Sequence, residues 1–178
     1  GGGARANITQ GKFTVAGATK VLPFNNTMVN LTMTGAQVKK VLNQAVDKAY
    51  LEFVDNSADG SDGAYPYSAG IRYDVDFNRP AGQRVHNFEV KAKGDGTWSK
   101  LSDDRELVVV TNNYIAGGKD GYLAFGEISA DKSKYEDTLK LYTETFIDYV
   151  RGLTANGEKI KPVADEDRST QTFTPKAK

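Results

Sequence analysis

The chain has 178 residues, enough for one domain that buries about two-thirds of the surface its unfolded form would expose. It contains 23 Lys and Arg against 23 Asp and Glu, no cysteine and one histidine, which excludes disulfides and thiolate metal sites and gives no basic field to attract nucleic acid. We therefore treat residues 1–178 as a single domain with no nucleic-acid partner, and because no apolar run reaches roughly 18 residues, we expect no membrane span in it.

The first segment combines glycine turns with two residues that a ligand can reach. Three glycines shortly precede Arg5, so the backbone can turn tightly and hold the guanidinium outward; the alternative is a terminal arginine in solvent. A short strand is expected within residues 8–15. Pro23 then fixes its own φ angle and places Phe24 at a rigid corner, where the ring either meets a ligand or packs in the core.

The next segment predicts a strand followed by a helix. Apolar and polar residues alternate over 27–33, which indicates a strand with one buried face. Thr34 and Gln37 have the spacing of a capping box, and apolar residues recur at helical spacing beyond them, so a helix is expected over about 35–50. The acidic stretch 55–63 has the composition of a calcium loop, but it lacks a glutamate at the twelfth position, and we interpret it as a solvated loop.

Two alternating runs then predict a hairpin. The alternation is strict over residues 71–77, and a second run over 85–90 places His86, Phe88 and Val90 on the face opposite Val85. Residues 107–110 are all apolar, which predicts a strand that is covered on both faces.

The loop over residues 111–122 is a candidate binding loop. It holds three glycines together with Tyr114, Tyr122 and Asp120. The glycines permit close approach of another molecule, and the rings and the carboxylate supply stacking faces and acceptors for a flat polar ligand. The alternative is a tight glycine turn whose tyrosines belong to the core.

The last third predicts one helix and a tail. Ser133 and Glu136 have the spacing of a second capping box, an apolar stripe follows, and Gly152 is the expected helix stop. The polar stretch 163–178 predicts a loosely ordered tail, of which about half is ordered. Hairpins with helices set between them indicate an α+β fold, with layered mixed or antiparallel sheets and packed helices.

Five motifs in chain order resemble the C-terminal domain of the 5′-nucleotidase family, which includes UDP-sugar hydrolases and 2′,3′-cyclic-nucleotide phosphodiesterases. The resemblance runs over nearly the whole chain, and the order of the motifs makes it specific. The motifs are the glycine run ending in Arg5, the corner Pro23-Phe24 nineteen residues later, Thr34-Gly35, Gly63-Ala64-Tyr65, and the loop Asn113-Tyr114…Gly117-Gly118-Lys119-Asp120-Gly121-Tyr122.

The resemblance implies roles for six residues. Phe24 and Tyr114 would stack on the two faces of a nucleobase, with Tyr114 standing where phenylalanine is more usual in the family. Arg5 and Asp120 would hold the ribose and neighbouring groups. The two further contacts implied are the Asn26 side chain at the base edge and the Gly63 backbone.

The resemblance also implies what this chain lacks. Family members hydrolyse nucleotides with two divalent metal ions in an N-terminal metallophosphoesterase domain, so this chain would hold no cofactor of its own and would be inactive alone. It would recognise the nucleotide, in the periplasm, at the cell surface or as a secreted protein. Nucleoside monophosphates, cyclic nucleotides, UDP-sugars and NAD stay open as substrates, as does the preferred base. A stand-alone nucleotide-binding module and a non-catalytic interaction domain are the alternatives.

Overall fold

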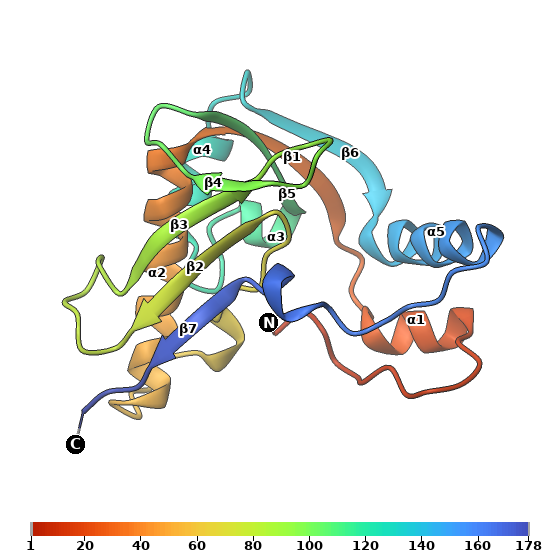
Figure 1. The fold of residues 1–178 in the computed structure, drawn as a ribbon, viewed down its shortest axis with the longest axis horizontal. Coiled ribbons are helices and arrows are strands. Elements are labelled where there is room, and N and C mark those ends of the chain that lie inside the picture. Colours follow the sequence, from red (N-terminus) through yellow and green to blue (C-terminus); the bar gives the residue numbers. More distant parts are fainter. Residues whose placement is uncertain (1, 178) are drawn as a thin grey trace.

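Two β-sheets and a long helix that packs against both form the body of the protein (Figure 1). The structure is a computed structural model and describes residues 2–177. Its elements are α1 (Val15–Val21), β1 (Thr27–Thr34), α2 (Gly35–Phe53), the 3₁₀ turn η1 (Asp62–Ala64), β2 (Ile71–Asp76), β3 (Val85–Lys91), β4 (Trp98–Lys100), β5 (Glu106–Asn112), α3 (Asn113–Ala116), α4 (Leu123–Ser129), β6 (Tyr135–Leu141), α5 (Tyr142–Ala155), η2 (Asp165–Asp167) and β7 (Thr170–Thr174).

The two sheets share one core, as an α+β fold requires. The first has the order β5-β1-β6, with β1 antiparallel to both neighbours. The second has the order β4-β3-β2-β7, in which β7 is parallel to β2 and the other pairs are antiparallel. Apolar side chains from α2, α4 and one face of each sheet meet in a single cluster, whose burial is the dominant stabilising contribution.

The capping box before α2 is confirmed in both halves. The backbone N–H of Gln37 donates to Thr34 Oγ1 at 3.3 Å, and the Thr34 N–H donates to Gln37 Oε1 at 2.8 Å. These bonds satisfy two of the amide groups that a helix start leaves unpaired. The strand before the helix is also confirmed, as β1.

The predicted strand within residues 8–15 is wrong. Helix α1 begins at Val15 instead, because the side chain of Thr14 accepts a hydrogen bond from the Gly17 N–H at 3.1 Å and caps it. A local cap of this kind outweighs the weak β propensity of so short a segment.

The hairpin is confirmed as β2 and β3, but the face predicted for Val85 is wrong, and so is the covering predicted for β5. Asn87 has a φ of 53° at an irregularity in the β2–β3 register, so Val85 is buried on the same side as Phe88 and Val90. Strand β5 is not covered on both faces, since Val108 and Val110 are exposed.

The predicted second capping box is also wrong. Ser133 makes its hydrogen bonds to Asp131 Oδ1, through its N–H at 3.0 Å and its hydroxyl at 2.7 Å, so it forms a turn rather than a helix start. Residues beyond it form β6, which pairs with the open edge of β1. Helix α5 therefore begins at Tyr142, and it passes the expected stop at Gly152 to end just before Gly157, whose φ is 75°.

The tail predicted over 163–178 contains regular structure as far as the described residues reach. Strand β7 pairs in parallel with β2. The Tyr73 N–H donates to the carbonyl of Ser169, just before β7, at 2.8 Å, and the Phe77 N–H donates to that of Thr174, the last residue of β7, at 2.9 Å. The segment therefore adds the last strand to the second sheet, while the described residues on either side of η2 and β7 have no regular structure.

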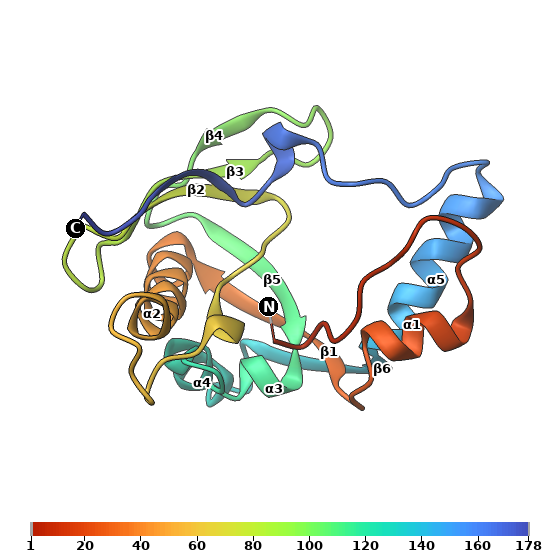
Figure 2. The ribbon, with the colours of Figure 1, turned by 90° about the horizontal axis from the view of Figure 1, so that it is seen from below.

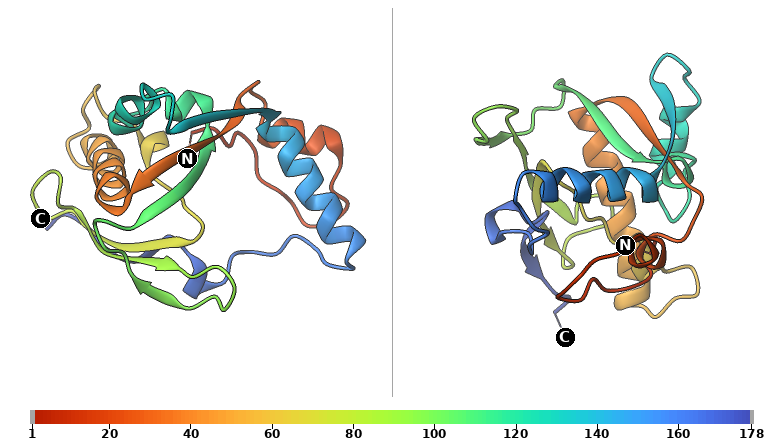
Figure 3. Two further views of the ribbon diagram at one scale, coloured as in Figure 1. Left: turned by 90° about the horizontal axis from the view of Figure 1, so that it is seen from above. Right: turned by 90° about the vertical axis from the view of Figure 1, so that its right-hand side faces the viewer.

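Helices α1 and α5 lie together beside the body, and we call this pair the α1–α5 arm (Figures 2 and 3). The rings of Phe13 and Phe146 meet edge to face, with centroids 5.6 Å apart, where the two helices pack. After α5 the chain returns across to the second sheet as an extended segment. No helix within residues 2–177 is both long and apolar enough to cross a bilayer.

Candidate functional site

Phe24 and Tyr114 lie at the same end of the first sheet. Phe24 stands three residues before β1 begins, and Tyr114 follows the end of β5, its antiparallel neighbour. The Thr27 N–H donates to Asn113 Oδ1 at 3.3 Å and ties the two segments together. Each ring is 47% exposed, so neither belongs to the core. Two aromatic faces are therefore available to a ligand at this end of the sheet.

The two tyrosines of the binding loop differ in burial. Tyr122 is only 7% exposed and donates its hydroxyl to the Ala64 carbonyl at 2.9 Å, so it is a core residue that anchors the loop. Tyr114 points outward and donates its hydroxyl to Asp120 Oδ1 at 3.2 Å. The core alternative is thus correct for Tyr122 and wrong for Tyr114.

Asp120 carries the negative charge of the loop. Its φ of 53° lies in the left-handed region and turns the backbone sharply between Lys119 and Gly121. The Asp120 carboxylate raises the pKa of Tyr114, because a nearby negative charge disfavours the phenolate. Tyr114 is therefore a hydrogen-bond donor at neutral pH, and it orients the carboxylate.

The amino-terminal glycines pack on the turn that contains Gly63. The Gly2 N–H donates to the Gly63 carbonyl at 3.0 Å, and a Cβ atom built on Gly63 would stand 3.1 Å from Gly2 Cα. Only glycines allow two backbones to approach so closely. Arg5 follows, with its N–H donating to the Val21 carbonyl at 2.8 Å and its Nη1 donating to the Gly2 carbonyl at 3.2 Å. Its guanidinium is exposed beside the glycine turn.

The remaining predicted contact, Asn26, lies at the entrance to β1. Its carbonyl accepts from the Tyr142 N–H at 2.9 Å, and the residue is partly buried. Hydrogen bonds connect the segments that carry the six predicted residues. They run from Arg5 through Gly2 to Gly63, from Ala64 to Tyr122 in the loop of Tyr114 and Asp120, and from Asn113 to the segment that carries Phe24 and Asn26.

Two residues that contact this region were not predicted from the sequence. Tyr142 and Thr143 bond the backbone on either side of Phe24. In the sequence Tyr142 belongs to an apolar stripe that indicates only a helix face, and nothing in the spacing points to residues so far upstream.

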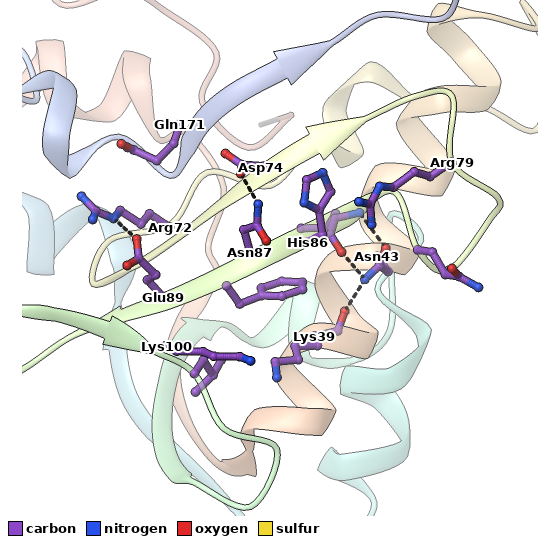
Figure 4. Close-up of a pocket in the computed structure, with 15 residues that line it drawn as sticks. Lys39, Asn43, Arg72, Asp74, Arg79, His86, Asn87, Glu89, Lys100 and Gln171 are labelled. Atoms are coloured by element: carbon purple, nitrogen blue, oxygen red, sulfur yellow. Dashed lines mark hydrogen bonds and ion pairs between the residues drawn. The ribbon is translucent and has the colours of Figure 1, made fainter.

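A hollow of about 780 Å³ lies away from these residues, between α2 and the β2–β3 hairpin (Figure 4). Its charged groups are largely paired with each other or with neighbours, as in Arg72 Nε to Glu89 Oε2 at 2.7 Å and Lys39 Nζ to Asp103 Oδ1 at 2.6 Å. His86, the only histidine of the sequence, lines it, and its Nδ1 is buried without a hydrogen-bond partner among the described residues. The hollow contains none of the six predicted residues.

The part of the chain that the structure describes offers no ready metal centre. Within residues 2–177, no three side chains of His, Cys, Asp or Glu come together in a way that could hold an ion. The six residues offer two rings that can stack, and a guanidinium, a carboxylate, an amide and backbone groups that can hydrogen-bond.

The comparisons with known proteins agree on one family. The family model described as the 5′-nucleotidase C-terminal domain matches residues 1–127. An NAD 5′-nucleotidase of Haemophilus influenzae is 41% identical over 153 residues, covering 84% of this chain and 24% of the relative. A probable 5′-nucleotidase of Treponema pallidum is 38% identical over 151 residues, again covering 84% of this chain and 24% of the relative.

A solved structure of Haemophilus influenzae NAD nucleotidase superposes with a TM-score of 0.82 at 35% identity, covering 99% of this chain and 29% of that one. The chain thus spans about a quarter of the length of the relatives that it matches. The family match, the fold and the five ordered motifs together show that this chain belongs to the 5′-nucleotidase C-terminal domain family.

Proposed function

We propose that this chain is the part of a 5′-nucleotidase-type hydrolase that recognises the nucleoside portion of a nucleotide. One observation carries the proposal: two half-exposed rings, Phe24 and Tyr114, stand at one end of one sheet on segments joined by the Thr27–Asn113 hydrogen bond. Other aromatic residues of the chain are as exposed, so the support comes from the position of this pair, on two segments tied together at the same end of the first sheet, where both ring faces can stack on a flat ligand. The base would stack between these two rings.

The other four residues would surround the sugar and the base edge. Asp120 accepts from the ribose hydroxyls with the lone pairs that Tyr114 leaves free, and the Arg5 guanidinium holds neighbouring polar groups. The Asn26 side chain reaches the base edge, and the Gly63 backbone closes the site beside Arg5.

The phosphoryl chemistry would take place in another domain of the same polypeptide. A metallophosphoesterase domain preceding this chain would hold two divalent metal ions that activate water and stabilise the charge on the phosphoryl group. Such a protein would act in the periplasm, at the cell surface or outside the cell. The chain by itself would release no phosphate from AMP with any divalent metal, and release above a buffer blank would contradict this assignment.

The binding role is tested by titrating adenosine into the isotopically labelled chain. Stacking contributes about 1–3 kcal/mol per ring contact, and association entropy offsets much of it, so the dissociation constant should lie between tens of micromolar and the millimolar range. The amide signals around Phe24 and over residues 113–122 should move together. No shift at millimolar adenosine would refute the proposal.

Two alanine variants separate recognition from stability. Phe24→Ala and Tyr114→Ala should each weaken adenosine binding several-fold and leave the melting temperature nearly unchanged, because both rings are half exposed. Tyr149→Ala, which removes another exposed ring, is the matched control and should leave binding unchanged. If Phe24→Ala or Tyr114→Ala melts far below the parent, that ring is structural.

A further inference from the structure

The corner that carries Phe24 is held by the first two residues of α5. Thr143 Oγ1 donates to the Leu22 carbonyl at 2.6 Å, the Phe24 N–H donates to Tyr142 Oη at 3.1 Å, and the Tyr142 N–H donates to the Asn26 carbonyl at 2.9 Å. Alternate residues of the corner are thus each bonded to the same point of α5. These contacts join positions more than a hundred residues apart in the chain.

These bonds fix a segment that no sheet supports. The corner precedes β1, which begins only at Thr27, and Pro23 has no N–H to donate. The Tyr142 ring is buried, so its hydroxyl is a fixed point, while the Phe24 side chain stays half exposed. The backbone of Phe24 is fixed by hydrogen bonds while its ring stays half exposed. This arrangement is expected of a ring that contacts a ligand, not of a core residue.

The start of α5 is in turn fixed to the sheet that carries Tyr114. Strand β6 runs directly into α5 and pairs with β1, with Leu141 opposite Thr27. The Thr27 hydroxyl donates to Asp137 Oδ2 at 2.9 Å, and the Thr27 N–H donates to Asn113 beside Tyr114. The position of the Phe24 ring relative to the Tyr114 ring therefore depends on the junction of β6 and α5.

We propose that Tyr142 and Thr143 are positioning residues, which aim Phe24 at Tyr114 and thereby set the affinity of the site for a nucleobase. Both lie outside residues 1–127, the span that the family model matches. The inference rests on the proposed function, because it assigns these residues to the same base-binding site. It also gives β6 and α5 a role in recognition, although none of the six predicted contact residues lies in them.

The test uses a double variant that removes both side-chain hydrogen bonds and keeps the shapes. Tyr142→Phe with Thr143→Val should raise the dissociation constant for adenosine about three- to tenfold, the range expected when one or two modest hydrogen bonds cease to support a contact. Tyr149→Phe with Thr145→Val removes the same atoms from the same helix, away from the corner, and should leave the constant unchanged.

Ring signals distinguish positioning from general loosening. With carbon-13 labels in the rings, adenosine should shift both Phe24 and Tyr114 in the parent. In the double variant, the Phe24 shift at saturation should shrink while the Tyr114 shift persists. Equal ring shifts with parent-like affinity in the double variant would overturn the inference. Absence of adenosine binding by the parent would instead refute the proposed function, and with it this assignment.

Single changes at Thr143 keep the test decisive if the double variant unfolds. Thr143→Ser retains the hydroxyl and loses the methyl group, whereas Thr143→Val retains the shape and loses the hydroxyl. Positioning through the bond to Leu22 predicts that Ser binds adenosine like the parent and that Val binds more weakly. The reverse order would show that Thr143 acts only by packing.

Discussion

The two rings of the proposed site are held in different ways. The bonds nearest to Tyr114 are local, although Tyr122 anchors the loop to Ala64: the side chain of Asn112 caps α3 by accepting from the Ile115 N–H at 2.9 Å, and Tyr114 bonds Asp120 six residues on. Phe24 depends on α5, more than a hundred residues away. One half of the site is therefore a local motif, and the other half is assembled by the fold. Variants in each half should have different consequences.

Removing the core tyrosine of the loop should have the largest effect. Tyr122→Ala deletes a buried ring and its bond to the Ala64 carbonyl, and it should lower the free energy of unfolding by about 3–5 kcal/mol. Urea unfolding followed by circular dichroism measures this change. Tyr67→Ala, at a well exposed ring, should cost less than about 1 kcal/mol, and a similar cost for both would show that the loop is not anchored through Tyr122.

Asp120→Ala should impair recognition more than stability. A hydrogen bond to a charged group contributes about 1.5–3 kcal/mol, so in the complete polypeptide the Michaelis constant for a nucleotide should rise about tenfold or more. Hydrolysis of a phosphate ester without base or ribose should hardly change. Equal losses on both substrates would mean that Asp120 shapes the protein instead of contacting the nucleoside.

Alkaline pH should lower the free energy of unfolding through Tyr122, the core residue of the binding loop. Burial, reinforced by the charge of Asp120, raises the pKa of Tyr122, so the folded protein keeps a proton that the unfolded chain releases above about pH 10. The folded state then binds more protons than the unfolded state, and the free energy of unfolding should fall as the pH rises past that value. Tyr122→Phe should make the fall shallower in urea titrations at alkaline pH. An unchanged slope would show that this hydroxyl ionises normally.

The smallest effect is expected for Tyr114→Phe. The ring face remains, and the lost bond to Asp120 is exposed to water, so adenosine affinity should change by no more than about threefold. Calorimetric titration beside the parent provides the comparison. A larger loss, accompanied by loss of discrimination between adenosine and 2′-deoxyadenosine, would show that the hydroxyl is needed to orient Asp120.

Sequence patterns predicted what is determined within a few residues. The capping box of Thr34 and Gln37 and the alternation over β2 follow from local geometry, and both are confirmed. The errors have physical causes of another kind. Ser133 forms its hydrogen bonds with Asp131, and the residues expected to begin a helix instead pair as β6 with the free edge of β1. The Asp131–Ser133 pair is only two residues apart, but the spacing of a capping box pointed the other way, whereas the pairing of β6 with β1 joins segments more than a hundred residues apart in the chain.

Some features of the candidate site were likewise predicted from local sequence, and others were not. The glycine loop and the corner at Phe24 carry recognisable residue types, and the Thr27–Asn113 hydrogen bond joins the two segments. The supports supplied by Tyr142 and Thr143 could not be predicted, because a tyrosine at helical spacing reads only as a buried face. The sequence also does not distinguish the core tyrosine of the loop from the exposed one; the bond from Tyr122 to the Ala64 carbonyl does.

The parallel pairing of β7 with β2 constrains the order of folding. The β2–β3 hairpin can close as soon as both strands leave the ribosome, since a short turn joins them. The other edge of β2 must wait until Thr170 emerges, and that late closure carries the entropic cost of a loop of about a hundred residues. During synthesis β2 therefore presents an open edge able to pair with another chain, a period in which the nascent protein is exposed to aggregation.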